Sequence, residues 1–327
     1  MAVTIKDIAK ALSLSPAAVS LALNDSPMVS QETIRRVKAT AKKMNYVRNQ
    51  YARGLVRGRS GTVALVIPDI ENVFFASLVK HVSNIATSYG VTISITNESL
   101  EAERRTIEAL IQQRAEAILL APVNRPITDE AYLEFLASCP VPLVFTTAPH
   151  PNVDHPCVMS DLESGMRALA NHVIEKGAHR IVLLTGPAGV QTLDLRERGF
   201  FEAIYAANRI GDVWRVDEVT HQNASARVAT AEDLPDALIC VNDMMAIGAL
   251  NTLHARGIRV PHEMLVAGFD DSVFSEVSSI PLTTVRQDVP QIAQRSVEIA
   301  LSLIRGKRAE RDEIVPCVLI PRRSTEG

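Results

Sequence analysis

The sequence predicts a protein in two parts, a small all-helical head followed by a large α/β body with parallel sheets in two lobes. Its 327 residues, 47% of them hydrophobic, are too many for one ordinary core and indicate two or three domains. The first sixty residues hold eleven Lys and Arg against three Asp and Glu, which leaves 23 basic against 34 acidic residues in the remainder. From Gly61 onward, short apolar runs alternate with longer amphipathic segments, as strands and helices do in α/β proteins.

The charge is divided unequally between these two parts. The head carries +8 and the body −11, although the whole chain carries only −3 at pH 7. A basic module on an acidic body indicates an anion-binding head, most often one for nucleic acid. A solvated basic surface without a partner is the alternative at this point.

Several other classes of protein lack support in the sequence. No apolar run approaches the ~20 residues that span a bilayer, and the N-terminus alternates charged with apolar residues, unlike a signal peptide. The four cysteines are far apart and form no C-x-x-C pair, so we interpret them as reduced core residues of a cytoplasmic protein. They are Cys139, Cys157, Cys240 and Cys317.

The sequence of the head predicts three short helices. Thr4 is placed to cap the first helix, and Asp7 lies where a capping residue would return the hydrogen bond. After a short break, Ser15 is placed to cap a second helix with Pro16 at its first position. A third helix begins after Ser30 and pairs an apolar face with a basic one. The basic face comprises Arg35, Arg36, Lys38, Lys42 and Lys43.

Two short helices joined by a tight turn, with a third packed beneath, form a helix-turn-helix arrangement. The stretches TIKDIAKALSLSPAAVSLALN and VSQETIRRVKATAKKMNYVRNQYARGL closely resemble the DNA-binding head of the LacI/GalR family, the lac and purine repressor family of bacterial transcriptional regulators. The resemblance implies a DNA-binding domain at residues 1–48, a hinge helix at 49–60 and an effector-binding and dimerisation domain at 61–327.

The resemblance also implies that the helix opening at Ser15 enters the major groove, one from each subunit of a dimer. Pro16, Ala17 and Leu21 would then face the bases, and none of them can form bidentate hydrogen bonds to base edges. Sequence discrimination would therefore depend on thymine methyl contacts, DNA shape and the hinge. Small residues that merely start a helix are the alternative. The rest of the predicted DNA-binding set in this domain is Thr4, Ala18 and, as phosphate or packing groups, Ser15, Ser20, Asn24, Thr33, Arg35 and Tyr46.

The stretch NQYARGLVRGR that follows the head is basic and weak as an isolated helix. Gly54 and Gly58 each cost a helix up to ~1 kcal/mol relative to Ala, whereas binding to phosphates offsets the repulsion between its arginines. In the family this segment is a hinge helix that pairs with its twin in the minor groove. Leu55 matches the leucine wedge of that hinge, with Arg53 and Val56 beside it as further DNA contacts. A flexible basic linker is the alternative.

The sequence of the body predicts two successive series of strands and helices. Buried strands without polar alternation indicate parallel sheets with helices on both faces, and two series imply two lobes with a cleft between them. In the first series we expect strands at 63–67, 91–96, 117–120 and 141–146, with helices at 74–89, 101–113 and 129–138. In the second we expect helices at 162–176, 195–208 and 244–256, with strands at 181–185, 213–219, 237–241 and 265–269.

The body motifs PDIENVFF, RERGF, VNDMMAIGAL, VAGFDDS and PLTTVRQD extend the resemblance along nearly the whole chain. The family's body resembles periplasmic sugar-binding proteins, in which the chain crosses between the lobes three times. The resemblance therefore implies a first lobe at about residues 61–159 and 289–312 and a second at about 160–287 and 313–323. A helix at 290–305 would belong to the first lobe, and the segment 315–321 would rejoin the second.

Ligand contacts in open α/β lobes come from loops at the carboxyl ends of strands. Aromatic faces beside carboxylates and amides suit the C–H face and hydroxyl edge of a sugar, and Arg196 precedes the Gly199-Phe200 pair where family members bind their effector. A nucleobase or another small metabolite is the alternative ligand. The predicted effector residues are Asp69, Asn72, Phe74, Phe75, Thr192, Arg196, Asn242, Asp243, Asp270 and Gln287.

Purely structural roles compete with these assignments. Asp243 could cap a helix, Arg196 could form a salt bridge and Phe74 could simply pack in the core. The pair Thr146-Thr147 occupies the place where many relatives carry an aspartate after the fourth strand, which removes one carboxylate that would bind a hydroxyl.

Motifs for catalysis are missing from the sequence. It contains no GxxxxGKS or GxxxxGKT phosphate loop, no HExxH and no GxSxG. Three prolines make the stretch from His150 to Cys157 an extended connection rather than a metal site. We therefore expect no cofactor and a dimeric, effector-controlled repressor of a carbohydrate-use operon that binds a pseudo-palindromic operator. A transport-type solute-binding protein or a nucleotide-sugar-modifying enzyme is the competing class.

Overall fold

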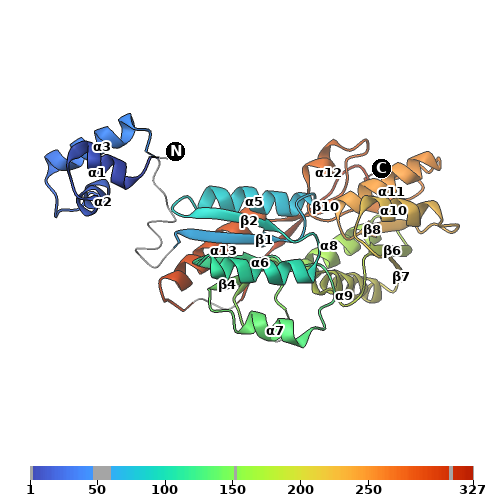
Figure 1. Ribbon diagram of the computed structural model, residues 1–327. Coiled ribbons are helices and arrows are strands. Elements are labelled where there is room, and N and C mark those ends of the chain that lie inside the picture. Colours follow the sequence, from blue (N-terminus) through green and yellow to red (C-terminus); the bar gives the residue numbers. More distant parts are fainter. Residues whose placement is uncertain (1–2, 47–59, 151–152, 309–311, 327) are drawn as a thin grey trace. The chain divides into compact units, whose positions relative to one another are not determined.

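The computed structural model describes residues 3–46, 60–150, 153–308 and 312–326. The chain divides into two compact units, Met1–Ser60 and Gly61–Gly327, which are described separately here (Figure 1). The predicted hinge residues Arg53, Leu55 and Val56 lie outside the described residues.

The first unit contains the three predicted helices, α1 (Ile5–Leu12), α2 (Pro16–Leu23) and α3 (Gln31–Lys43). The carboxylate of Asp7 accepts hydrogen bonds from the backbone N–H of Thr4 at 2.8 Å and from its hydroxyl at 2.7 Å, which confirms the predicted start of α1. The Oγ of Ser15 accepts the N–H of Ala18 at 3.1 Å and confirms the start of α2. The core of this unit is Ile8, Ala9, Val19, Ala22, Ile34, Val37 and Ala41.

The first lobe of the second unit is a six-stranded parallel sheet in the order β11-β5-β4-β3-β1-β2. Its strands are β1 (Thr62–Ile67), β2 (Gly90–Ile95), β3 (Ala117–Leu120), β4 (Leu143–Phe145), β5 (Cys157–Ser160) and β11 (Asp312–Val315). Its helices are α5 (Val73–Ile85), α6 (Leu100–Gln112), α7 (Glu130–Ala137) and α13 (Val289–Ile304).

Both faces of this sheet are covered, which explains why its central strands are apolar throughout. Val63 and Leu65 of β1 pack in the cluster formed with α5 and α13, whereas Ala64 and Val66 pack in the cluster formed with α6 and α7 (Figure 1). Successive side chains of a strand point to opposite faces, so an uninterrupted apolar run indicates burial on both sides.

The second lobe contains a four-stranded parallel sheet in the order β7-β6-β8-β9. Its strands are β6 (Arg180–Thr185), β7 (Ile210–Arg215), β8 (Ala237–Cys240) and β9 (Leu265–Ala267). Its helices are α8 (Leu162–Glu175), α9 (Gln191–Ala206), α10 (His221–Ala229), α11 (Asp243–Ala255) and α12 (Val273–Val277). The strands β10 (Thr284–Gln287) and β12 (Cys317–Ile320) pair antiparallel beside this sheet.

The predicted architecture of two lobes with parallel sheets is confirmed, and three details need correction. Residues 313–315 belong to β11 of the first lobe, paired with β5, rather than to the second lobe. The strand expected at 213–219 lies at Ile210–Arg215 and pairs with β6 at the edge of the sheet. The expected helix 74–89 ends at Ile85. The elements β5, β10, β11, α10 and α12 were not predicted, because short elements carry too few apolar residues to show a clear period.

Candidate functional site

A cavity of about 820 Å³ lies between the two lobes of the body. Its walls come from loops that follow β1, β2, β3 and β4 in the first lobe and β6, β7, β8 and β9 in the second. Parallel strands bring their carboxyl ends to one edge, so these loops converge. Nine of the ten predicted effector residues line it, namely Asp69, Asn72, Phe74, Phe75, Thr192, Arg196, Asn242, Asp270 and Gln287.

The first-lobe wall begins with a short segment that is held by its own backbone. The Oδ1 of Asn72 accepts the N–H of Phe74 at 3.0 Å and so caps α5. The rings of Phe74 and Phe75 meet edge to face with centroids 5.2 Å apart, and both side chains are anchored in the core of the lobe. The Oδ1 of Asp69 accepts the N–H of Glu71 at 2.8 Å. This wall therefore presents aromatic surface beside carboxylate and amide groups.

The second-lobe wall is built around Arg196 on α9. Its guanidinium lies over the ring of Phe269, 4.4 Å from the centroid, and 3.6 Å from the Oδ1 of Asp270. The Nη1 of Arg196 donates to the carbonyl of Thr192 at 3.1 Å. Burial lowers the pKa of Arg196, and the carboxylate of Asp270 opposes that shift. The salt bridge considered from sequence exists, and it lies inside the cavity wall.

Glycine makes the position of Arg196 possible. A Cβ atom at Gly199, one turn further along α9, would collide with the carbonyl oxygen of Glu163 on α8. The absence of a side chain therefore lets α9 approach α8 closely. This close packing fixes the helix that carries Arg196 against the second-lobe core.

Asp270 follows β9 of the second-lobe sheet and contacts Gln287 at the end of β10, where the chain crosses to the first lobe. Its Oδ1 accepts a hydrogen bond from the Nε2 of Gln287 at 2.6 Å. Burial raises the pKa of Asp270 to about 6, against the opposing effects of Arg196 and of the Gln287 hydrogen bond. The carboxyl group is therefore mostly ionised at neutral pH and mostly protonated below its pKa.

Asp243, which was predicted to contact the effector, is not among the residues that line the cavity. Its Oδ2 accepts the N–H of Ser272 at 2.6 Å, and its Oδ1 accepts the hydroxyl of Thr284 at 2.6 Å. Burial, together with the nearby charge of Asp270, raises the pKa of Asp243 to about 8. The cap of α11 is instead Asn242, whose Oδ1 accepts the N–H of Met245 at 2.8 Å.

Three buried polar atoms in the cavity wall have no hydrogen-bond partner within the described residues. They are Thr146 Oγ1, Ser160 Oγ and Arg196 Nε. Native proteins leave few such atoms unpaired, so each of these three buried atoms lacks a partner that the fold would normally supply. Thr146 follows β4 and Ser160 ends β5. From the sequence, Thr146 was noted only as a substitution, and Ser160 was not predicted because β5 itself was not predicted.

Four charged residues of the wall were not predicted from the sequence, namely Glu98, Arg125, Asp217 and Glu218. With the predicted Asp69, Asp270 and Arg196 they give the wall five acidic and two basic residues. Glu98 follows β2 and accepts hydrogen bonds from the backbone and side-chain amides of Asn124 at 2.7 and 2.8 Å. The same rule of strand ends would have indicated Glu98 and Asn124, since both follow predicted strands.

The predicted DNA-binding residues of the head form two groups, those that are exposed and those that have local structural roles. Pro16 and Ala17 are exposed at the start of α2, and Leu21 is partly exposed one turn later. Other members of the set have local structural roles: the Nδ2 of Asn24 donates to the carbonyl of Ser20 at 2.7 Å. The hydroxyl of Thr33 pairs with that of Ser30, Tyr46 packs against the core, and Thr4, Ser15 and Ala18 form the helix starts described above. The predicted basic face of α3, including Arg35, is exposed.

Nothing in the described part of the chain offers a metal site or a membrane span. Among the described residues, no three or more His, Cys, Asp or Glu side chains are grouped to hold a metal ion. Within the same ranges, no helix combines the length and apolar character needed to cross a membrane.

Comparison with family models matches both units. Residues 4–49 match bacterial regulatory proteins of the lacI family, and residues 170–325 match a periplasmic binding protein-like domain. The ribose operon repressor of Halalkalibacterium halodurans is 31% identical over 330 residues, covering 99% of this chain and 97% of the relative. The transcriptional regulator GalR of Escherichia coli is 31% identical over 307 residues, covering 92% and 89%.

Solved structures agree with these matches. The lac repressor bound to ONPG in the repressed state is 25% identical, with a TM-score of 0.88 over 99% of this chain and 100% of that one. A complex of the transcriptional regulator CelR with cellobiose is 26% identical, with a TM-score of 0.73 over 98% and 99% of the two chains. The named relatives are regulators and repressors, which confirms the prediction of a regulator rather than an enzyme. The chain belongs to the lacI family of bacterial regulatory proteins.

Proposed function

We propose that this regulator is a cytoplasmic repressor that binds a pseudo-palindromic operator as a homodimer and is controlled by a sugar held between the lobes of its body. The observation that carries the proposal is the cavity of about 820 Å³, which is lined by nine of the ten residues predicted to bind an effector. Control requires the sugar to bind the DNA-bound and the free conformations with different affinities.

The unpaired polar atoms of the cavity wall support a hydroxyl-rich ligand. An unsatisfied buried polar group costs about 1–3 kcal/mol, and a ligand that supplies its partner recovers that cost. Thr146 Oγ1 and Ser160 Oγ both donate and accept, as sugar hydroxyls do, whereas Arg196 Nε only donates. Phe74 and Phe75 line the cavity but are only 9% and 4% exposed, so they would offer a sugar an apolar edge rather than a stacking face.

The charges of the cavity wall favour an uncharged ligand over an anionic one. Five carboxylates face two arginines among the lining residues, and one of those arginines, Arg196, is already 3.6 Å from Asp270. A phosphate group would meet an excess of negative charge in a partly desolvated site, where like charges repel strongly. A free sugar would instead use the carboxylates as hydrogen-bond acceptors.

At the DNA end, the proposed contacts are those predicted from the head and hinge. Pro16, Ala17 and Leu21 would pack against the major-groove edges of the bases. The basic face of α3 would add charge attraction to the phosphates, which predicts weaker binding as salt rises. The proposed hinge contacts Arg53, Leu55 and Val56 lie outside the described residues.

The effector is tested by a thermal-shift and calorimetric screen of free sugars, sugar phosphates and nucleobases. We expect a free sugar to raise the melting temperature and its phosphate to have no effect. Binding should be lost in Arg196→Ala and kept in Arg259→Ala, a matched variant of a second-lobe arginine whose side chain is 72% exposed and paired with Glu263. Selective binding of a phosphate or nucleobase would refute the sugar assignment.

The DNA-binding role is tested by gel shifts with the DNA that flanks the gene. We expect a sequence-selective shift that weakens with salt and changes when the effector is added. Leu55→Ala should weaken operator binding much more than binding to random DNA, because the wedge acts only in the specific complex. Equal losses on both DNAs would exclude the wedge, and the absence of any selective shift would exclude the regulator assignment.

A further inference from the structure

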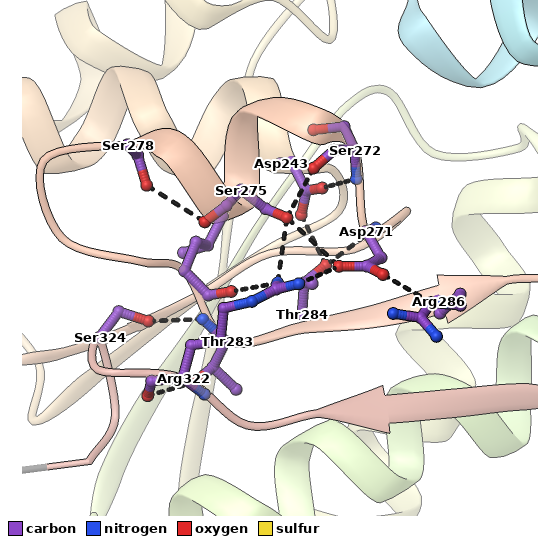
Figure 2. Close-up of polar contacts among 11 residues, drawn as sticks. Asp243, Asp271, Ser272, Ser275, Ser278, Thr283, Thr284, Arg286, Arg322 and Ser324 are labelled. Atoms are coloured by element: carbon purple, nitrogen blue, oxygen red, sulfur yellow. Dashed lines mark hydrogen bonds and ion pairs between the residues drawn. The ribbon is translucent and has the colours of Figure 1, made fainter.

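A buried network of polar contacts lies behind the second-lobe wall of the cavity and is centred on Asp271 (Figure 2). The Nη2 of Arg322 donates to its Oδ1 at 2.7 Å, and the Nε of Arg286 donates to its Oδ2 at 2.6 Å. The side chains of Asp271 and Arg322 are only 7% and 15% exposed, whereas that of Arg286 is 54% exposed. Arg322 is therefore the buried partner of this carboxylate.

Arg322 makes further hydrogen bonds through its guanidinium and its backbone. Its Nη1 donates to the Oγ of Ser275 and to the carbonyl of Leu282, each at 3.0 Å. Its backbone N–H donates to the Oγ1 of Thr283 at 2.8 Å. A planar guanidinium can donate in several fixed directions at once, and here it connects the Asp271 loop, the middle of α12 and the residues that precede β10.

The loop that this arginine grips has an unfavourable backbone. Asp270 and Asp271 have φ values of +111° and +52°, in the region that favours glycine. Residues in this region are strained and persist where the surroundings hold them in place. The N–H of Asp270 donates to the carbonyl of Val285 at 2.8 Å, and the N–H of Asp271 donates to the Oγ1 of Thr284 at 3.2 Å. The loop is therefore held by β10 on one side and by Arg322 on the other.

The neighbouring carboxylates of Asp270 and Asp271 therefore have different partners. Asp271 faces Arg322 and Arg286 in the network, and Asp270 faces Arg196 and Gln287 in the cavity wall. Burial alone would raise the pKa of Asp271, but the hydrogen bonds from the two arginines outweigh it and hold that pKa below its ordinary value. Asp271 stays ionised and can anchor the loop while its neighbour remains available to a ligand.

We infer that Arg322 is a positioning residue for effector binding: by clamping Asp271 it holds the strained Asp270–Asp271 loop so that the Asp270 carboxylate stays aimed into the cavity. Arg322 does not line the cavity. The inference rests on the proposed function, because it assigns Asp270 to effector binding.

The test compares two adjacent arginines in the full chain. Arg322→Gln removes the clamp, whereas Arg323→Gln changes an exposed neighbour whose Nη2 donates only to the carbonyl of Ser279, at 3.4 Å. The probe is whichever of D-ribose, D-galactose and cellobiose gives wild type its largest thermal shift. We expect calorimetry to show affinity for it at least 10-fold weaker in Arg322→Gln and unchanged in Arg323→Gln. Both variants should bind operator DNA like wild type without the sugar.

Two further measurements separate positioning from general stability. Arg322→Lys keeps the charge that attracts Asp271 but loses the fork that also reaches Ser275 and Leu282, so it should restore part of the lost affinity. Amide hydrogen exchange without sugar should quicken at residues 270–272 in Arg322→Gln and remain as in wild type in α8 and α9. If Arg322→Gln fails to fold, Arg322→Lys provides the same comparison, with a smaller loss of affinity and local faster exchange as the expected result.

The outcomes are distinct. Wild-type sugar affinity in Arg322→Gln, or exchange that is unchanged at residues 270–272, would overturn the inference alone. Faster exchange across the whole second lobe would also overturn it, since that result indicates a purely structural role. If wild type binds none of the three sugars and none of the wider screen, the proposed function fails and the inference fails with it.

Discussion

Two segments of the cavity wall, residues 69–72 in the first lobe and the Asp270–Asp271 loop in the second, are held in place by different kinds of contact. On the first-lobe side, Asn72 and Asp69 each bind a backbone N–H two residues away. On the second-lobe side, Asp270 binds Gln287, 17 residues away, and Asp271 binds Arg322, 51 residues away. Local contacts form with little loss of chain entropy, whereas distant ones require the fold to be complete. We therefore expect changes in the second-lobe wall to affect both binding and stability, and changes in the local segment of the first to have smaller effects.

The largest expected effect is that of Arg196→Ala. This variant leaves Asp270 buried without its cationic neighbour and removes one of the proposed ligand donors. Breaking a buried ion pair by removing one partner costs about 3–5 kcal/mol of folding stability. Loss of a charged hydrogen-bond donor to the sugar costs about 1.5–3 kcal/mol, so the affinity for the sugar should fall by about 10- to 100-fold. Calorimetry would measure the loss, with Arg259→Ala as the control. A fall of less than about threefold would show that Arg196 does not contact the sugar. It would also contradict the expectation that changes in the second-lobe wall have the larger effects.

The next effect concerns the pH dependence of stability. The pKa of Asp243 is about 8 in the folded protein and about 4 in the unfolded chain, so the folded state holds a proton that the unfolded state has released. Its contribution to stability is therefore fully present below pH 4 and is lost as the pH rises through 8. Asp243→Asn cannot ionise and should reduce this decline. Urea unfolding at pH 5 and pH 8 measures it, and equal declines in both proteins would contradict the assigned shift.

A smaller effect is expected on sugar binding at low pH. The pKa of Asp270 is about 6, and its ionised carboxylate is the better acceptor for sugar hydroxyls. The affinity should therefore fall as the pH drops from 7.5 to 5, by up to about 10-fold for each pH unit below the pKa, the limit for release of one proton. Asp270→Asn should bind more weakly at pH 7.5 and show a flatter profile. An unchanged profile in the variant would assign the titration to another group.

The smallest effects compare matching caps on the two walls. Asn72 caps α5 and Asn242 caps α11, and each accepts one backbone N–H. Loss of such a cap costs about 1 kcal/mol, so Asn72→Ala and Asn242→Ala should lower the free energy of unfolding by similar amounts. If the sugar affinity of one variant falls by more than about fivefold, the amide side chain removed in that variant also contacts the ligand. Urea unfolding and calorimetry on the same samples provide both values.

Much of the cavity could be predicted because strand ends are visible in the sequence. The rule that ligands bind beyond the carboxyl ends of parallel strands, together with the family resemblance for Arg196 and Gln287, selected nine lining residues before any geometry was known. The helix starts of the head were equally accessible, because Thr4 with Asp7 and Ser15 with Pro16 act within a single turn. These predictions succeed because the interactions concerned join residues close together in the chain.

Asp243 shows where that rule stops. It follows the same strand as Asn242, yet the neighbouring side chains take different directions as the helix begins, about 100° apart for each residue. Asn242 lines the cavity, whereas Asp243 turns inward to Ser272 and Thr284. Both residue types suit either role, so only the packing of the loop against α11 could separate them.

The alternation of apolar and amphipathic segments, the charge of the head and the local caps depend on short stretches of sequence, and they predicted the longer elements, the two lobes and the edge of the sheets at which the cavity lies. Tertiary structure decided which carboxylate meets which arginine, why β11 joins β5, and which hydroxyls are left unpaired in the cavity. The reason is physical: the partners of these groups lie tens to more than a hundred residues away, and burial creates both their pKa shifts and their need for a partner.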